Sequence, residues 1–249
     1  MPALAADLVG RKVALIAACG GAGEALVAKR ATATIPIVFT TGADPVANGL
    51  VASLSRPGGN LTGVTLLNVL LMQKRFELIS ELVQKTRLIV LLVNPTNPAV
   101  GGIIESAQEA VGAKGLQLQI LRAGTAAEID AAFTTLVRLH ADALIVADVL
   151  FDSRSAQIAA LAARYKVPTI GIWRKYVAAG GLISYSANIA AGYHQAGLYA
   201  GKILNGARPG DLPVQQPTEF ELVINLNTAK ALGLTIPPSI LARANEVIE

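Results

Sequence analysis

Polar side chains follow two short apolar runs of the chain, at positions where they can meet a ligand. Asn94 comes directly after the run from Leu88 to Val93, Asn97 comes three residues later, and Asp148 follows the run from Ala143 to Ala147. A carboxylate at such a position can accept a hydrogen bond from a cationic or hydroxyl group, and a side-chain amide can both donate and accept. These residues predict a site that binds a small polar molecule.

Each of these residues also has a structural alternative. Asp148 can instead cap a helix expected after Ser153, and Asn97 is placed to cap the helix that follows Pro98. The backbone amides at the start of that second helix favour an anionic group. Asp148 and Asn97 can therefore each act as a helix cap or as a ligand contact.

Aromatic side chains lie at further predicted strand ends. Phe151 follows the strand that ends before Asp148, Trp173 follows the run Ile170 to Ile172, and Tyr185 lies near the end of the strand from Leu182 to Ser186. An aromatic residue at the carboxyl end of a parallel strand faces the ligand crevice. The alternative for Trp173 is simple packing under a loop.

A glycine-rich turn provides a second candidate chemistry. Gly20, Gly21 and Gly23 lie between a predicted strand and a helix, where their backbone amides are open to a ligand. Leu26 stands where a dinucleotide fingerprint has its third small residue, and no P-loop lysine follows. A doubly wound α/β enzyme that uses a nucleotide at Gly20 to Gly23 is therefore the alternative function.

The sequence offers no arrangement typical of catalysis. Cys19 is the single cysteine, which excludes an intrachain disulfide and a cysteine-based metal cluster. His140 and His194 are far apart in the sequence, and neither follows a predicted strand. No nucleophile elbow and no metal-ligand spacing emerges. We therefore expect a binding protein and not an enzyme, with no cofactor and no metal.

The segment from Arg87 to Gln119 predicts one complete βαβ unit that positions the first two polar residues. Its apolar run is too short for a helix and is typical of a strand buried on both faces. Pro95 and Pro98 end this strand, apolar residues at helical spacing follow, and Leu116 to Leu121 resumes as a strand. In such sheets the ligand binds at the carboxyl ends of the strands.

The rest of the chain alternates between the same two patterns. Further strands are expected at Val13 to Ala18, Ile35 to Thr40, Leu61 to Leu66, Ala143 to Ala147, Val167 to Ile172, Leu182 to Ser186 and Phe220 to Ile224. Helices are expected at Val46 to Leu54, Leu70 to Gln84, Ala126 to Arg138, Ser155 to Tyr165 and Gly192 to Leu204. This alternation predicts an α/β fold with parallel sheets flanked by helices.

Two connections indicate that the chain visits one lobe, enters another and returns. They lie at Val64 to Leu70 and at Ser184 to Ala191. We expect a first lobe of residues 1–67 and 187–212 and a second lobe of residues 68–186 and 213–249. A cleft and a hinge are expected between them.

Composition and net charge indicate which classes of protein this chain can belong to. Hydrophobic residues make up 53% of the 249 residues and charged residues 15%, which favours a large core. The apolar runs are shorter than the roughly 18 residues of a membrane span. The net charge is +4, but the basic residues are scattered, so nucleic acid is not an expected partner.

Several segments together resemble the ABC-transporter substrate-binding proteins of the kind described as tryptophan- or tyrosine-binding. The resemblance covers nearly the whole chain, and its most specific parts are Arg56 to Val64 and Asn94 to Pro98. The matching segments are Ile35 to Phe39, Arg56 to Val64, Val93 to Pro98, Asp44 to Val46, Ala178 to Tyr185 and Asp211 to Pro217.

This resemblance implies a two-lobed periplasmic-binding-protein fold of type I. It further implies that a small molecule, such as an aromatic or other amino acid, is held by hinge closure and delivered to an ABC permease from the periplasm. Carried over by position, the ligand-binding residues would be Gly20, Gly21, Thr40, Asp44, Asn94, Asn97, Asp148, Phe151, Trp173 and Tyr185. A sensor domain related to the sugar-binding halves of repressors is the third interpretation, and the sequence lacks its helix-turn-helix segment.

The amino terminus departs from the family pattern. No export signal is evident, and Leu4 to Val9 is typical of the tail of a helix. We expect the chain to lack the signal and the first βαβ segment of its family, so that the first lobe is incomplete. An exposed edge of its sheet would then favour a homodimer.

Overall fold

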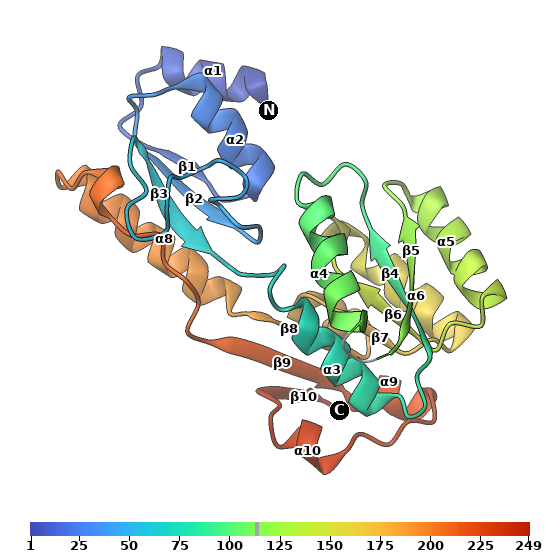
Figure 1. The fold of residues 1–249 in the computed structure, drawn as a ribbon. Helices are drawn as coiled ribbons and strands as arrows, with labels where there is room; N and C mark the ends of the chain where they lie inside the picture. Colours follow the sequence, from blue (N-terminus) through green and yellow to red (C-terminus); the bar gives the residue numbers. More distant parts are fainter. Residues whose placement is uncertain (113–114) are drawn as a thin grey trace. The chain divides into compact units, whose positions relative to one another are not determined.

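The computed structural model describes residues 1–112 and 115–249, which form two compact units (Figure 1). The first comprises Met1–Val69 and Ala187–Phe220, and the second comprises Leu70–Ser186 and Glu221–Glu249, so the chain passes between them three times. Residues 213–220 were expected in the second lobe. They group with the first unit because Val214 donates to the carbonyl of Leu54 and Gln215 to that of Gly63.

The first unit is built on a parallel sheet with the strand order β1-β2-β3. Alternate side chains of a strand face opposite sides of the sheet. Ile16 and Phe39 pack with Ala25 of α2, whereas Ala17 and Val38 lie on the side of α8 (Figure 1). The elements are α1 (Pro2–Gly10), β1 (Ile16–Ala18), α2 (Ala22–Ala31), β2 (Ile37–Thr41), β3 (Leu61–Thr65), α8 (Ile189–Leu204) and the 3-10 helix η2 (Pro209–Asp211).

The segment after β2 does not form the helix predicted for residues 46–54, so this prediction was wrong. The chain instead forms turns from Pro45 to Gly49, and Gly49 has a φ of +65°, which does not fit a helix. Leu50 and Val51 then pack into the core of the first unit.

The second unit contains a larger sheet with the strand order β10-β9-β8-β7-β6-β4-β5. The pairs from β5 through β8 are parallel. The elements are α3 (Met72–Leu82), β4 (Leu88–Val93), α4 (Val100–Gly112), β5 (Gln117–Arg122), α5 (Ala126–Arg138), β6 (Ala143–Val146), the 3-10 helix η1 (Val149–Arg154), α6 (Ser155–Tyr165), β7 (Thr169–Gly171), α7 (Arg174–Ala178), β8 (Ile183–Ala187), β9 (Phe220–Asn225), α9 (Leu226–Ala231), α10 (Pro238–Leu241) and β10 (Glu246–Ile248). The predicted α/β fold with parallel sheets and flanking helices is confirmed.

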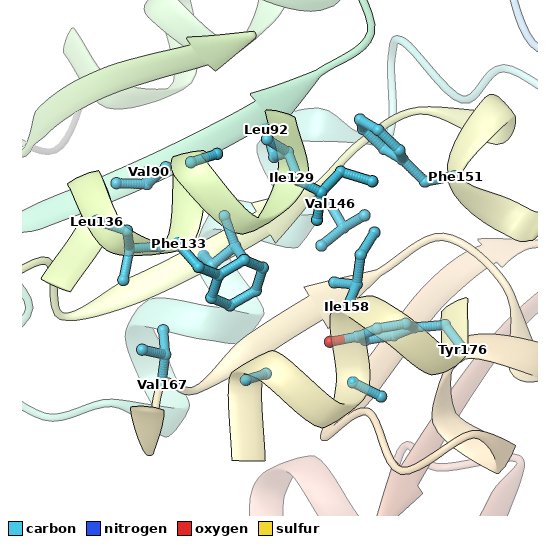
Figure 2. Packing of buried hydrophobic residues seen from close by; sticks show 14 of the residues in the cluster. Val90, Leu92, Ile129, Phe133, Leu136, Val146, Phe151, Ile158, Val167 and Tyr176 are labelled. Atoms are coloured by element: carbon cyan, nitrogen blue, oxygen red, sulfur yellow. The ribbon is translucent and has the colours of Figure 1, made fainter. Parts of the chain in front are cut away.

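One hydrophobic cluster of the second unit lies between the sheet and the helices α5 and α6 (Figure 2). Val90, Leu92 and Val146 of the sheet pack there against Phe133 of α5 and Ile158 of α6. The residues from Ile89 to Val93 are each no more than 1% exposed. The predicted burial of this strand on both faces is therefore correct.

No helix within residues 1–112 and 115–249 has both the length and the apolar character that a membrane crossing requires.

Tyr176 is enclosed by two glycines beside the carboxyl end of β7. A Cβ atom at Gly171 would lie 2.4 Å from Cδ1 of Tyr176, and a Cβ atom at Gly181 would lie 2.2 Å from its Cε1. The Tyr176 hydroxyl is 2.5 Å from that of Thr169, and burial raises the pKa of this phenol. These glycines are required because the ring occupies the space that a side chain would fill.

We predict that Gly171→Ala lowers the free energy of unfolding by about 1–3 kcal/mol, because the new methyl group displaces the Tyr176 ring. Urea denaturation would measure this change. Gly101→Ala in α4 is the control, since no atom outside its chain neighbours and the local backbone of its own helix lies within 4 Å of its Cβ position. We expect this control to be neutral or stabilising by up to about 1 kcal/mol. Equal effects of the two substitutions would contradict the steric argument.

Candidate functional site

The carboxylate of Asp148 is enclosed by donors from the loops that follow β4 and β6. Its Oδ2 accepts from the backbone N–H of Asn94 at 3.1 Å. Its Oδ1 accepts from the side-chain amide of Asn97 at 2.8 Å and from the backbone N–H of Leu150 at 2.9 Å. Asp148 thereby caps the 3-10 helix η1 and not α6, the helix that was expected after Ser153. The three polar residues predicted from the sequence are therefore neighbours.

The two asparagines also shape their own loop. Oδ1 of Asn94 accepts from the backbone N–H and the hydroxyl of Thr96, at 3.0 and 2.8 Å. Oδ1 of Asn97 accepts from the backbone N–H of Ala99 at 2.9 Å. Such side-chain turns fix a loop that has no strand or helix pairing of its own.

Burial raises the pKa of Asp148 above its ordinary value of 3.8. Removal of the carboxylate from water is the larger effect, and the hydrogen bonds from Leu150, Asn97 and Asn94 lower the pKa by less. A carboxylate that is 3% exposed and already accepts three hydrogen bonds is placed to hold loops together.

Two predicted aromatic residues meet Asp148 at a small recess of about 10 Å³, roughly the size of one water molecule. Trp173 is half-buried and directly precedes α7. Phe151 is 3% exposed and belongs to the hydrophobic core (Figure 2). The recess is lined by Val146, Asp148, Phe151, Asp152, Ser155, Gly171, Ile172, Trp173 and Tyr176. Trp173 thus presents an aromatic surface beside the polar strand ends, whereas Phe151 mainly packs the core.

The backbone of Tyr185 binds a residue that the sequence analysis missed. Arg75 of α3 is 0% exposed, and its Nε donates to the carbonyl of Tyr185 in β8 at 2.9 Å. Burial lowers the pKa of Arg75 to about 9, which leaves the guanidinium protonated at neutral pH. A sequence signal existed, because Arg75 lies on the same helical face as Met72 and Ile79, both of which are buried.

The predicted residues of the first unit take part in local structure. The hydroxyl of Thr40 donates to the carbonyl of Cys19 at 3.0 Å, which joins the ends of β2 and β1. Oδ1 of Asp44 accepts from the N–H groups of Val46 and Ala47 at 2.8 and 3.2 Å, so Asp44 caps a turn. Asp44 is exposed.

The glycine turn before α2 is partly filled by a carboxylate. Gly21 has a φ of +120°, a conformation that favours glycine. A Cβ atom at Gly20 would lie 2.8 Å from Cδ and 3.0 Å from Oε1 of Glu24. The negative charge of Glu24 therefore already lies at the start of this helix, where a phosphate would otherwise be favoured.

Two larger hollows lie in the first unit, and neither is lined by a predicted ligand-binding residue. One of about 510 Å³ is bordered by the start of α8, the end of β3 and the segment 215–219. The other, of about 420 Å³, is bordered by α8, β1 and β2, and its lining is Ala17, Cys19, Val38, Tyr193, Ala196, Gly197 and Ala200. Sequence patterns did not reveal them because they are formed by segments far apart in the chain.

Within residues 1–112 and 115–249, no group of three or more His, Cys, Asp or Glu side chains is arranged to hold a metal ion.

The raised pKa of Asp148 predicts a specific pH dependence of stability. Because the pKa of Asp148 is higher in the folded protein, the folded protein binds this proton more tightly than the unfolded chain. The stability due to Asp148 therefore falls as the pH rises from about 3.8 through the raised pKa. We expect the advantage of the wild type over Asp148→Asn to be larger near pH 3.5 than near neutrality. Urea denaturation of both proteins across this range would measure it. An advantage that grows with pH would contradict the burial argument.

Comparisons with known proteins agree on one family. The model of the ABC transporter substrate binding protein family matches residues 2–248. A tyrosine-binding protein of Clostridioides difficile (strain R20291) is 29% identical over 211 residues, which are 85% of this chain. The chain spans 61% of the length of that relative.

Solved structures give the same result. A conserved domain protein of Vibrio cholerae O1 biovar El Tor is 30% identical with a TM-score of 0.91, over 99% of this chain and 84% of its own. An ABC domain from Streptococcus pneumonia, solved in complex with L-Trp, is 26% identical with a TM-score of 0.90, over 99% of this chain and 85% of its own. With the family match extending over nearly its whole length, this chain belongs to the ABC transporter substrate-binding protein family.

Proposed function

We propose that this chain is the solute-binding component of an ABC-type uptake transporter and that its ligand is an aromatic amino acid. The observation that carries this proposal is the family match over residues 2–248. The ligand class is supported by a relative described as tyrosine-binding and by a similar structure that holds L-Trp.

The strand ends of the second unit suit such a ligand. Trp173 is half-buried and offers a ring face for stacking, and aromatic pairs prefer offset or edge-to-face contact. The side-chain oxygens of Asn94 and Asn97 already accept hydrogen bonds within their loop, so these amides can offer a ligand carboxylate an N–H donor. We therefore assign ligand contacts first to Trp173 and to the loop from Asn94 to Asn97. The contribution of Gly20, Gly21, Thr40, Asp44 and Tyr185, in a cleft closed by a hinge, stays a prediction.

The nucleotide-dependent enzyme is the weaker interpretation. A nucleotide would bring its phosphates to the turn at Gly20 and Gly21, where the carboxylate of Glu24 already lies. Two negative groups at one helix start repel each other, and a phosphate there would lose the stabilisation that makes such sites common.

Location and partners follow from the family and form part of the proposal. Its members typically work outside the cytoplasmic membrane, so we place this protein in the periplasm with an ABC permease as its partner. A homodimer through the exposed sheet edge of the first unit also stays a prediction.

Isothermal titration calorimetry would test the ligand class. We expect one molecule of L-tyrosine, L-phenylalanine or L-tryptophan to bind with a Kd of about 1 μM or below, corresponding to about −8 kcal/mol. L-Alanine and D-glucose are controls that lack the aromatic ring, and we expect neither to bind measurably. Flat titrations with all three aromatic amino acids would contradict the proposal.

Trp173 permits a second test because it is the single tryptophan of the chain. We expect the fluorescence of Trp173 to change when L-phenylalanine, which absorbs at shorter wavelength, is added. Trp173→Ala should weaken L-tyrosine binding about tenfold through loss of the stacking surface, and Trp173→Phe should weaken it less. Unchanged calorimetric affinity in Trp173→Ala would exclude Trp173 as a ligand contact.

A further inference from the structure

At each end of the strand pair β4 and β6, an aspartate accepts hydrogen bonds from backbone N–H groups. At the amino end, Oδ2 of Asp142 accepts from the backbone N–H groups of Arg87 and Leu88 at 2.7 and 2.9 Å. At the carboxyl end, Asp148 accepts the three hydrogen bonds described above. The two aspartates are about 20 Å apart along the strand, at about 3.3 Å per residue.

The two ends differ in how the carboxylate is used. Asp142 accepts both bonds on a single oxygen, so an asparagine can preserve them with its one carbonyl oxygen. Asp148 uses both oxygens, and all its partners are N–H donors. An asparagine at residue 148 would turn its own NH₂ group toward a donor, so at least one hydrogen bond would be lost.

We infer that Asp148 is a positioning residue of the ligand site: it holds the loops after β4 and β6 in the geometry that binds ligand and does not contact the ligand itself. This inference rests on the proposed function, because the site is the one assigned there. It follows from the three bonds of a carboxylate that is 3% exposed, since a ligand would have to break them to reach it.

The held loops are the ones that bear the assigned ligand contacts. The bond from the side chain of Asn97 reaches from the β4 loop, and the bond from Leu150 closes the turn that carries Phe151 into the core. Asp148 also lines the recess beside Trp173. Loss of this carboxylate therefore releases the Asn94 to Asn97 loop and alters the support of Trp173, while the opposite end of the sheet stays intact.

Matched asparagine substitutions at the two ends test the inference. We expect Asp148→Asn to weaken L-tyrosine or L-tryptophan binding by roughly tenfold or more, the effect typical of residues that orient the direct contacts of a site. Asp142→Asn should leave the affinity within about twofold, because it lies at the far end of the same strand pair. Leu136→Ala, in the core and 1% exposed, controls for general destabilisation and should also bind normally once folded.

The outcomes separate this inference from the proposed function. Wild-type affinity in folded Asp148→Asn would overturn the positioning role, and so would an equal loss in Leu136→Ala. If Asp148→Asn does not fold, as judged by circular dichroism, Asp148→Glu replaces it, since it keeps the charge but moves it by one methylene. The same affinity criterion then applies.

A failure of the wild type to bind any of these amino acids would count against the proposed function alone. The positioning role is then read from acrylamide quenching of Trp173. We expect quenching to increase in Asp148→Asn and not in Asp142→Asn, because only the first substitution lies at the recess of Trp173. Equal quenching in both variants would overturn the inference.

Discussion

The burial of β4 on both faces is the constraint on which the second unit depends. Residues Ile89 to Val93 are almost fully excluded from water, so their backbone groups have to pair inside the protein. Pairing with β5 on one side and β6 on the other provides those partners. The apolar faces are covered by helices, and polar side chains gather at the two ends of the strand. The ligand site proposed at this strand end would therefore stand on a base that the core keeps rigid.

The burial of β4 also explains why the polar residues at its carboxyl end mainly bind each other. A loop that leaves a buried strand carries backbone N–H groups that need acceptors, and water reaches few of them. Asp148, Asn94 and Asn97 supply these acceptors. The shape of this loop therefore depends on side chains that are themselves largely buried. In the first unit the corresponding strand ends are joined more simply, by the hydroxyl of Thr40 and the carbonyl of Cys19.

Sequence patterns predicted most of the elements and the loops that carry Asn94, Asn97 and Asp148. The run from Leu88 to Val93 and the prolines after it predicted β4, its burial and the position of its loop, because strand length and proline geometry are local properties. The role of Asp148 was not predictable in the same way. Its partners Asn94 and Asn97 lie 54 and 51 residues earlier, and only the folded sheet brings them together.

Two further differences have equally specific causes. The helix expected over residues 46–54 does not form, because a turn at Gly49 delivers Leu50 and Val51 into the core. Arg75 escaped notice because a charged residue on an apolar helical face is usually an interruption of the pattern. Here the carbonyl of Tyr185 accepts from its guanidinium, which a sequence pattern alone does not reveal.

Because the chain passes between its units three times, neither unit is encoded by one continuous segment of the gene. The first unit needs residues 187–220 as well as residues 1–69, and residues 70–186 stand between them. No uninterrupted stretch of gene encodes the first unit without also encoding most of the second. In genetic terms residues 70–186, the greater part of the second unit, are an insertion within the first unit. Recombination can exchange this inserted segment, but it cannot remove the first unit as a single segment.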